Sequence, residues 1–321
     1  MEKKTISLGF IGTGIAANDL HWPAIEQLGN KFNVAAVCNR SRSKAEAFAL
    51  KCNSTMVYDT ADELLADKNV DAVVVAVPIE LNYGMARLAI ASGKHVLLEK
   101  PLAASLDEAK ILRDLVPQNR QVLLLAENFR YHKAFTKIKE LMADNAIGEV
   151  ISFCWNDYKS LHIDNKYATA WRKNNQYPGG FIFDGGIHNV AALRMIFGDV
   201  QTEVSATKSV NPEIGTIDTL ISTLVFENGV TGNLNLCYST NGFEQNRLLV
   251  LGKNGSICFE NDELKLYSQS KVELLATTDL SDSYLCQFDD FYNCIVSGAA
   301  PQSTFAEGVK DIELMVRLLE A

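Results

Sequence analysis

The sequence predicts a two-domain α/β protein, in which a doubly wound parallel sheet is followed by a large open, mostly antiparallel sheet. The chain has 321 residues, more than one hydrophobic core usually holds. Residues 1–126 alternate short apolar runs with amphipathic segments, the pattern of parallel strands with helical crossovers. In residues 127–321 the apolar runs alternate with polar residues and are separated by turn signals. We therefore expect a domain boundary at residue 126.

The first domain is predicted from its apolar runs. Strands are expected at residues 5–11, 33–38, 72–77, 95–98 and 122–126. Helices are expected between them, at residues 43–50, 61–66, 81–91 and 106–115. The run AVVVAV at 72–77 contains no polar residue, which predicts a strand buried on both faces, as in a parallel sheet covered by helices.

The second domain begins with a predicted helix at residues 134–143 and a strand at 150–158. Between residues 202 and 277, strand-like runs are separated by the turn signals ENG, GKNG and NDE. Two helices, at residues 284–296 and 305–319, are predicted to end the chain. The polar alternation indicates one sheet with a solvent-facing side, which suits sheet-to-sheet packing in a homodimer or homotetramer.

Charge and cysteine content argue against several classes of protein. A net charge of -9 provides no basic surface for nucleic acid or an anionic membrane. Seven cysteines without a C-x-x-C pair indicate free thiols in a reducing compartment. The opening MEKKTISLGFIG contains too short an apolar run for a signal peptide or a membrane span. We expect a cytoplasmic protein without nucleic-acid or membrane partners.

The segment FIGTGIAAND follows the first predicted strand and carries the dinucleotide-binding pattern G-x-G-x-x-A. The first glycine permits a tight turn, the second lets the backbone approach a pyrophosphate, and the alanine allows close packing. The start of the next helix offers N–H groups and a positive dipole end to phosphates. A turn without a ligand is the structural alternative, which the flanking strand and helix disfavour. Cofactor contacts are predicted for Gly12, Thr13, Gly14, Ile15 and Ala17.

The end of the second strand, CNRSRSK, bears on the choice between NAD and NADP. An NAD site usually has Asp or Glu here for the ribose 2′-hydroxyl, whereas this chain has Asn39, Arg40 and Ser41. Arginine and hydroxyl groups suit a 2′-phosphate. For Arg42 and Lys44 the structural alternative is a solvated position on the following helix. We predict NADP rather than NAD as the cofactor.

The segment GGFIFDGGIHNVAALRMIFG places Asp184 and His188 four residues apart at a predicted helix start, and so on one face. A histidine can exchange a proton near neutral pH, and a nearby carboxylate can orient it. An N-capping Asp with a packed His is the structural alternative. A metal site would need His132 or His162 in addition, and no zinc motif supports it, so no metal is predicted.

Four stretches occur in a characteristic order: GTGIAA at 12–17, EKP at 99–101, AENFRYHKAF at 126–135 and GGFIFDGGIH at 179–188. In these motifs the sequence resembles the glucose–fructose oxidoreductase/inositol 2-dehydrogenase family (Gfo/Idh/MocA) of NAD(P)-dependent oxidoreductases, over nearly the whole chain. The resemblance implies a Rossmann domain at residues 1–126 and a substrate-binding and oligomerisation domain at 127–321. It also implies that Lys100, Asp184 and His188 are the catalytic residues.

Further site residues are predicted beside these motifs. For the cofactor they are Asn39, Arg40, Ser41, Pro78, Asn82, Glu99, Lys100 and Asn128. For the substrate they are Lys100, Tyr158, His162, Trp171, Arg172, Asp184 and His188, because aromatic and polar side chains suit a sugar or polyol ring. The chain departs from the family pattern at Asn82, where many members have the His of P-N-x-x-H, and at the Tyr177–Pro178 pair.

The stretch HVLLEKPLAAS carries the predicted catalytic lysine. Pro101 ends ladder pairing and favours an extended conformation at Lys100, at the strand end where such sheets bind ligands. The resemblance implies a cis Lys100–Pro101 peptide bond. Glu99 is expected either to pair locally or to contact the cofactor. A solvated lysine at the strand end is the structural alternative for Lys100.

The predicted function is NADP-dependent hydride transfer to or from a secondary alcohol or ketone of a sugar, inositol or related cyclic polyol. His188 would act as the general acid/base, Lys100 would stabilise an alkoxide, and Asp184 would hold a substrate hydroxyl. Alternatives within the family are a dihydrodiol or dicarbonyl-sugar enzyme and a non-catalytic NAD(P)-binding sensor.

Overall fold

The computed structural model describes residues 5–115, 120–161, 166, 169, 171, 177–211, 213–214, 217–269 and 271–320. The chain divides into two compact units. Unit 1 comprises Met1–Asn128 and Ser281–Lys310, and unit 2 comprises Phe129–Leu280 and Asp311–Ala321. The sequence predicts a single boundary after residue 126, with all later residues in the second domain. The units differ from this prediction because residues 281–310 return to the first unit.

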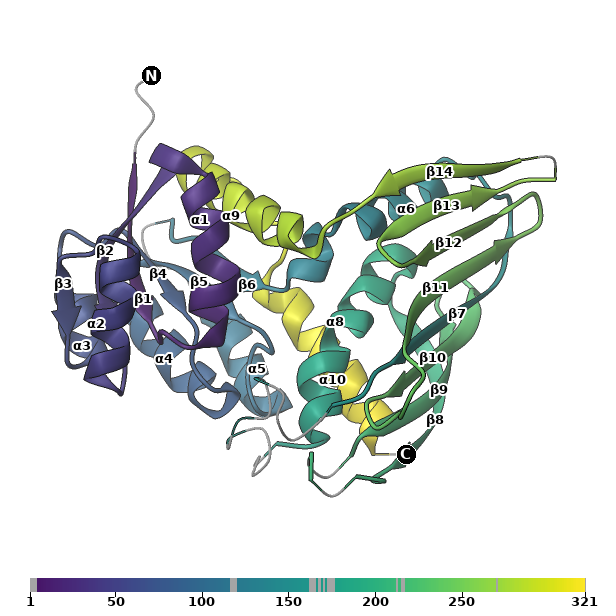
Figure 1. Cartoon of the computed structure of the whole chain (residues 1–321), viewed down its shortest axis with the longest axis horizontal. Helices are drawn as coiled ribbons and strands as arrows, with labels where there is room; N and C mark the ends of the chain where they lie inside the picture. The colour runs from purple at the N-terminus through teal and green to yellow at the C-terminus, as the bar shows by residue number, and fades with distance from the viewer. Residues whose placement is uncertain are drawn as a thin grey trace. The chain divides into compact units, whose positions relative to one another are not determined.

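Unit 1 contains a parallel sheet, as predicted, and its six strands lie in the order β3-β2-β1-β4-β5-β6 (Figure 1). Its strands are β1 (Ile6–Ile11), β2 (Phe32–Cys38), β3 (Met56–Tyr58), β4 (Ala72–Val75), β5 (His95–Glu99) and β6 (Leu123–Ala126). The sequence does not predict β3, because its three residues are too few to show a periodicity. All four residues of β4 are buried, in agreement with its apolar run.

The four helices predicted for unit 1 are present as α2 (Arg42–Lys51), α3 (Ala61–Ala66), α4 (Ile79–Ala91) and α5 (Leu106–Asp114). Between β1 and β2, where the sequence predicts a helix start without bounds, the chain forms η1 (Ala16–His21), α1 (Trp22–Gln27) and a short 3₁₀ turn η2 (Gly29–Lys31). A capping box between Thr60 and Glu63 starts α3, and the Ser105 hydroxyl caps α5.

The helix α9 (Leu280–Ser297) explains the return of the chain to unit 1. Its Phe288 lies edge-on to His21 and to Phe32, with ring centroids 5.5 and 5.9 Å apart. Tyr292 of the same helix contacts Phe32, at 5.7 Å. These aromatic contacts join residues that are far apart in the sequence, so local periodicity cannot reveal them.

Unit 2 contains an eight-stranded sheet in the order β14-β13-β12-β11-β7-β10-β9-β8, in which only β7 and β10 pair in parallel. Its strands are β7 (Val150–Tyr158), β8 (Val200–Lys208), β9 (Thr219–Phe226), β10 (Thr231–Cys237), β11 (Gln245–Gly252), β12 (Ser256–Glu260), β13 (Glu263–Tyr267) and β14 (Val272–Thr277). The mostly antiparallel sheet of the prediction is therefore confirmed.

Helices cover one face of this sheet. They are α6 (Lys133–Ala143), α8 (Gly180–Phe197) and α10 (Phe305–Leu319), preceded by the 3₁₀ turn η3 (Asn128–Tyr131) (Figure 1). In β7, Phe153, Trp155 and Asp157 are buried on the covered face. Cys154 and Asn156, which alternate with them, are only half-buried on the opposite face.

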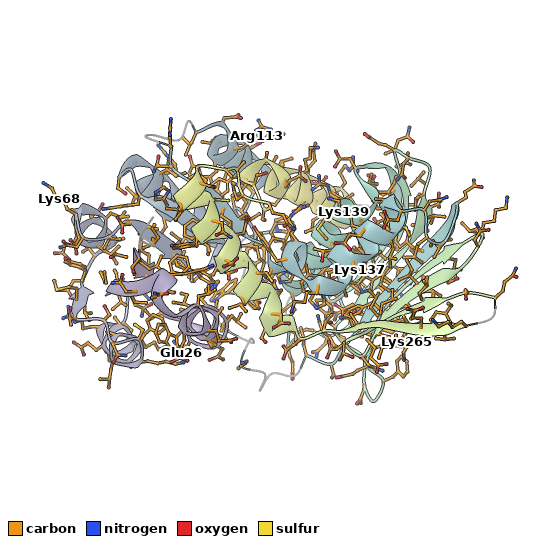
Figure 2. All side chains as sticks on the ribbon, turned by 90° about the horizontal axis from the view of Figure 1, so that it is seen from above. Glu26, Lys68, Arg113, Lys137, Lys139 and Lys265 are labelled. Carbon is orange, nitrogen blue, oxygen red and sulfur yellow. The ribbon has the colours of Figure 1, made fainter. Side chains whose placement is uncertain are left out.

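Charged side chains such as Lys68 and Arg113 project from the molecular surface (Figure 2). In unit 2, the buried residues Arg130, Arg194 and Asp311 form a chain of ion pairs that ends at half-buried Asp199. Asp311 accepts two hydrogen bonds from Arg130, at 2.9 and 2.7 Å, and a further one from Arg194, which also binds Asp199 at 2.6 Å. Burial raises the pKa of the Asp311 carboxyl, and the two guanidinium groups oppose that rise. This chain ties α10 to α8, which carries the predicted acid/base pair.

None of the helices among the described residues is long and apolar enough to cross a membrane.

Candidate functional site

Unit 1 carries one group of candidate site residues, at the carboxyl ends of its parallel strands. Gly12 follows β1 with φ 94°, and its N–H donates to the Cys38 carbonyl at 2.9 Å. A Cβ atom on Gly12 would lie 2.2 Å from the carbonyl oxygen of Ala76, which follows β4. Only glycine fits here, because β1 and β4 are neighbours at the point where the strand order reverses.

The turn after Gly12 has room for a ligand. A Cβ atom on Gly14 would meet no atom within 4 Å. The side-chain amide of Asn18 donates to the Thr13 and Gly14 carbonyls, at 2.9 and 3.0 Å, and thereby fixes the turn. The hydroxyl of Thr13 is buried and has no hydrogen-bond partner among the described residues. Open space beside a fixed backbone and an unsatisfied hydroxyl fit a dinucleotide phosphate group.

The residues after β2 connect to this turn. Asn39 accepts a hydrogen bond from the Thr13 N–H at 3.3 Å and donates to the Ser41 carbonyl at 3.1 Å. Arg42 pairs with Glu46 and Asp59 at 2.9 and 2.7 Å, so its charge is already compensated. Arg40 is exposed and forms no ion pair with the part of the chain that the structure describes. Of these two arginines, Arg40 is therefore the one available to a ligand.

The E-K-P segment follows β5, and its Lys100–Pro101 peptide bond is cis, as the resemblance implies. Glu99 has local partners at both oxygens: Oε1 lies 2.8 Å from Nε2 of the buried His21, and Oε2 accepts the Lys100 N–H at 3.0 Å. Of the two roles expected for Glu99, local pairing is the one the structure describes. Lys100 is half-buried at the carboxyl end of the strand.

Two residues predicted to contact the cofactor are instead enclosed by protein atoms. Asn82 is 0% exposed, and its amide donates to the carbonyls of Glu99 and Pro101, at 2.9 and 2.7 Å. Asn128 is 1% exposed and donates to the Ser283 hydroxyl at 2.9 Å. Both side chains therefore donate hydrogen bonds to protein groups beside the candidate site. Pro78, by contrast, is half-buried at the start of α4.

Unit 2 carries a separate group of candidate site residues, on α8. This helix begins at Gly180, so Asp184 stands more than one turn inside it, and the reading of Asp184 as an N-cap is wrong. Asp184 is buried and His188 is half-buried, and their spacing places them on one helix face. The Phe129 ring stacks on His188 with a centroid distance of 4.7 Å, which restricts the imidazole.

Sequence reasoning gave no site role to Asp157 or Tyr238, which lie beside Asp184. The Tyr238 hydroxyl is 3.4 Å from Oδ2 of Asp157, and Nζ of Lys159 is 3.0 Å from the same oxygen. The ammonium of Lys159 lies over the Tyr238 ring, 3.9 Å from its centroid. Burial raises the pKa of the Tyr238 hydroxyl far above its ordinary value, and the charges of Asp157 and Asp184 raise it further. Tyr238 therefore remains a hydrogen-bond donor at neutral pH.

The register of β7 corrects one substrate prediction. Tyr158 lies on the sheet face opposite to Asp157, beside Asn156 and Cys154, and its ring is near Phe243 at 6.4 Å. Since α8 covers the other face, Tyr158 does not point toward Asp184 or His188. The alternation of the segment SFCWND could have identified Asp157, because Asp157 shares its face with Phe153 and Trp155.

Two further substrate predictions, His162 and Arg172, lie outside the described residues. Trp171 is described, and its ring centroid is 6.5 Å from that of Tyr177. Among the described residues, no group of three or more His, Cys, Asp or Glu side chains could hold a metal ion.

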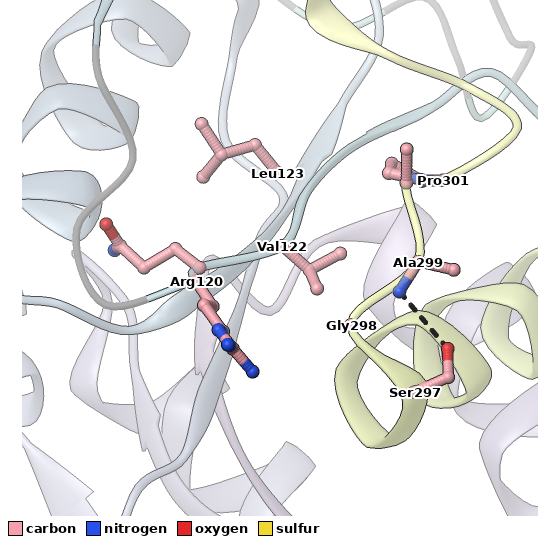
Figure 3. Close-up of a pocket in the computed structure, with 9 residues that line it drawn as sticks. Arg120, Val122, Leu123, Ser297, Gly298, Ala299 and Pro301 are labelled. Atoms are coloured by element: carbon pink, nitrogen blue, oxygen red, sulfur yellow. Dashed lines mark hydrogen bonds between the residues drawn. The ribbon is translucent and has the colours of Figure 1, made fainter.

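A pocket of about 440 Å³ lies elsewhere in unit 1 (Figure 3). Its lining residues are Arg120, Gln121, Val122, Leu123, Ser297, Gly298, Ala299, Ala300 and Pro301. The pocket lies at the amino end of β6, away from the carboxyl ends that carry the glycine turn and Lys100. It is therefore separate from the candidate cofactor site.

Two family models match this chain. Residues 6–127 match the family described as "Oxidoreductase family, NAD-binding Rossmann fold", and residues 135–258 match the "GFO/IDH/MocA C-terminal domain". The chain is 34% identical to an oxidoreductase from Thermotoga maritima of known structure, with a TM-score of 0.92 and coverage of 98% of this chain and 96% of that one.

Two other proteins are similar over their whole length. D-xylose 1-dehydrogenase (NADP(+)) 2 of Haloferax volcanii is 26% identical, over 98% of this chain and 96% of its own. A levoglucosan dehydrogenase, solved with NADH and levoglucosan, shares the fold with a TM-score of 0.89 at 20% identity, over 99% of this chain and 97% of its own.

The two glycines of the turn are expected to respond differently to a methyl group. Gly12→Ala should lower the free energy of unfolding by more than about 2 kcal/mol, because its Cβ would meet the Ala76 carbonyl at positive φ. Gly14→Ala should leave the urea midpoint unchanged but weaken binding of a reduced nicotinamide dinucleotide about 10-fold or more, measured by fluorescence titration. Unchanged cofactor binding by Gly14→Ala would place the phosphates elsewhere.

Proposed function

Because the chain belongs to the GFO/IDH/MocA family of NAD(P)-dependent oxidoreductases, we propose that it transfers a hydride between NADP and a secondary alcohol or ketone of a sugar, inositol or related cyclic polyol. The observation that carries this proposal is the acid/base pair of α8, in which Asp184 and His188 share a face beside Tyr238 and Asp157. This group offers several hydrogen-bond partners to a polyhydroxylated ring. The similarity to D-xylose 1-dehydrogenase (NADP(+)) 2 supports the same substrate class.

Each proposed catalytic residue has a role that follows from its chemistry. The bound nicotinamide would accept or donate the hydride. His188 exchanges the hydroxyl proton at a ring nitrogen, since the stacked Phe129 holds its imidazole in place. The Lys100 ammonium stabilises the negative charge on the substrate oxygen. Asp184 accepts a hydrogen bond from a substrate hydroxyl and so orients the carbon that reacts.

The preference for NADP rests on the end of β2. A carboxylate that would bind a ribose 2′-hydroxyl is missing there, because the position is occupied by Asn39, whose side chain binds Thr13 and Ser41. Arg40 is exposed beside it and suits a 2′-phosphate.

Measurement of turnover distinguishes the proposed function from two alternatives. A dihydrodiol or dicarbonyl-sugar enzyme would use the same residues on another substrate of the panel. A sensor would bind the cofactor without turnover, but it has no need of Lys100, Asp184 and His188 together. For the compartment we propose the cytoplasm, because all seven cysteines are free.

We expect kcat/KM to be higher with NADP than with NAD. Arg40→Ala should raise KM for NADP about 10-fold or more, as for the loss of a charge-assisted hydrogen bond of about 1.5–3 kcal/mol, and should leave KM for NAD unchanged. Arg42→Ala is the matched control, because Arg42 is already paired with Glu46 and Asp59. A wild-type preference for NAD would contradict the assignment of the cofactor.

Replacement of the proposed catalytic groups should affect kcat while the fold is retained. Lys100→Met and His188→Ala are each expected to lower kcat at least about 100-fold, measured from nicotinamide absorbance on a panel of sugars and polyols. Lys139→Met, on the exposed side of α6, serves as the lysine control. Near-normal turnover by either variant would remove that residue from the mechanism.

We also propose that the uncovered face of the unit 2 sheet forms a homodimer or homotetramer contact. Six large apolar side chains on that face are between 38% and 72% exposed: Val204, Ile221, Leu251, Tyr267, Val272 and Leu274. Their burial against a second copy would be favourable. Sedimentation equilibrium should therefore give at least a dimer for the wild type and a smaller species for Ile221→Arg/Leu274→Arg. A monomeric wild type would refute this contact.

A further inference from the structure

Asn82 lies on α4, the helix that precedes β5 in the chain, and Lys100 follows the end of β5. Its side chain is completely enclosed. Its amide nitrogen donates to two carbonyl oxygens, that of Glu99 at 2.9 Å and that of Pro101 at 2.7 Å. These carbonyls belong to the residues immediately before and after Lys100.

The chain leaves β5 after Glu99, and a backbone carbonyl that is removed from water there needs a hydrogen-bond donor. Asn82 supplies both hydrogen bonds with one amide group. The peptide unit between Glu99 and Lys100 is then held at its oxygen by Asn82 and at its N–H by Oε2 of Glu99, at 3.0 Å. The Glu99 carboxylate is held in turn by His21. The backbone from which the Lys100 side chain departs is thus fixed from two sides.

We propose that Asn82 is a positioning residue for Lys100: its amide fixes the turn that directs the ammonium group toward the substrate oxygen. This inference rests on the proposed function of Lys100. A displacement of about 1 Å at a catalytic group can reduce the rate about 100-fold, so the two hydrogen bonds affect kcat although Asn82 touches no reacting atom.

The chain offers a matched control in Gln121. Its amide also donates to two backbone carbonyls, those of Ile90 and Lys94, at 3.0 and 2.7 Å, and its side chain is 8% exposed. It does so at the amino end of the same sheet, near the start of β6. Each amide nitrogen donates to two backbone carbonyls, but only that of Asn82 binds the Lys100 turn.

The experiment compares Asn82→Leu, which is similar in size, with Gln121→Leu in the full-length protein. Both should lower the thermal midpoint, because each leaves two buried carbonyls unpaired. Asn82→Leu should lower kcat about 10- to 100-fold with KM for the cofactor within threefold, and Gln121→Leu should keep kcat within threefold. If Asn82→Leu does not fold, Asn82→Ala gives the same comparison without an overpacked side chain.

Hydrogen exchange gives a readout without turnover. Amides of residues 99–104 should exchange faster in Asn82→Leu than in the wild type and should be unchanged in Gln121→Leu. Unchanged exchange, or kcat equal to that of Gln121→Leu in a protein that requires Lys100, overturns the positioning role. If the wild type gives no turnover, or Lys100→Met remains active, the proposed function fails instead, and the exchange comparison still tests whether Asn82 holds the turn.

Discussion

The close approach of β1 and β4 is the constraint on which unit 1 depends. The strand order reverses between these two neighbours, and the chain leaves β1 through Gly12 with the Ala76 carbonyl where a side chain would lie. The glycine turn begins at this contact, and the Asn18 amide fixes the backbone of the turn by two hydrogen bonds. Because all strands of the sheet run in one direction, their carboxyl ends share one edge. The glycine turn, the Asn39–Ser41 segment and Lys100 therefore belong to one edge of one sheet.

Both units place buried polar groups where they determine the orientation of functional side chains. In unit 2, Asp311 binds Arg130 and Arg194, and the latter belongs to the helix of Asp184 and His188. In unit 1, Asn82 binds the carbonyls around Lys100. A buried polar group with a missing partner is costly, so each of these arrangements strongly favours a single geometry. That requirement makes them suitable supports for catalysis, which depends on accurate placement.

The position of Asn82 changes the role expected for it. The resemblance to the family implies a contact between Asn82 and the cofactor. In the structure its side chain faces the protein interior, and its amide donates to two backbone carbonyls. Asn82 therefore contacts the backbone of the E-K-P segment.

The sequence alone determined the elements and the motifs. The apolar runs predicted five of the six parallel strands, and the strand–glycine–helix pattern identified the cofactor turn, because periodicity and turn residues are local properties. Tertiary structure decided which side chains meet. The register of β7 directs Asp157 toward the face covered by α8 and Tyr158 toward the opposite face. Tyr238, directly after β10, then lies with its hydroxyl near Asp157. The return of α9 to unit 1 depended on ring contacts between residues far apart in the chain. These features depend on pairing and packing over long sequence separations, which local patterns do not encode.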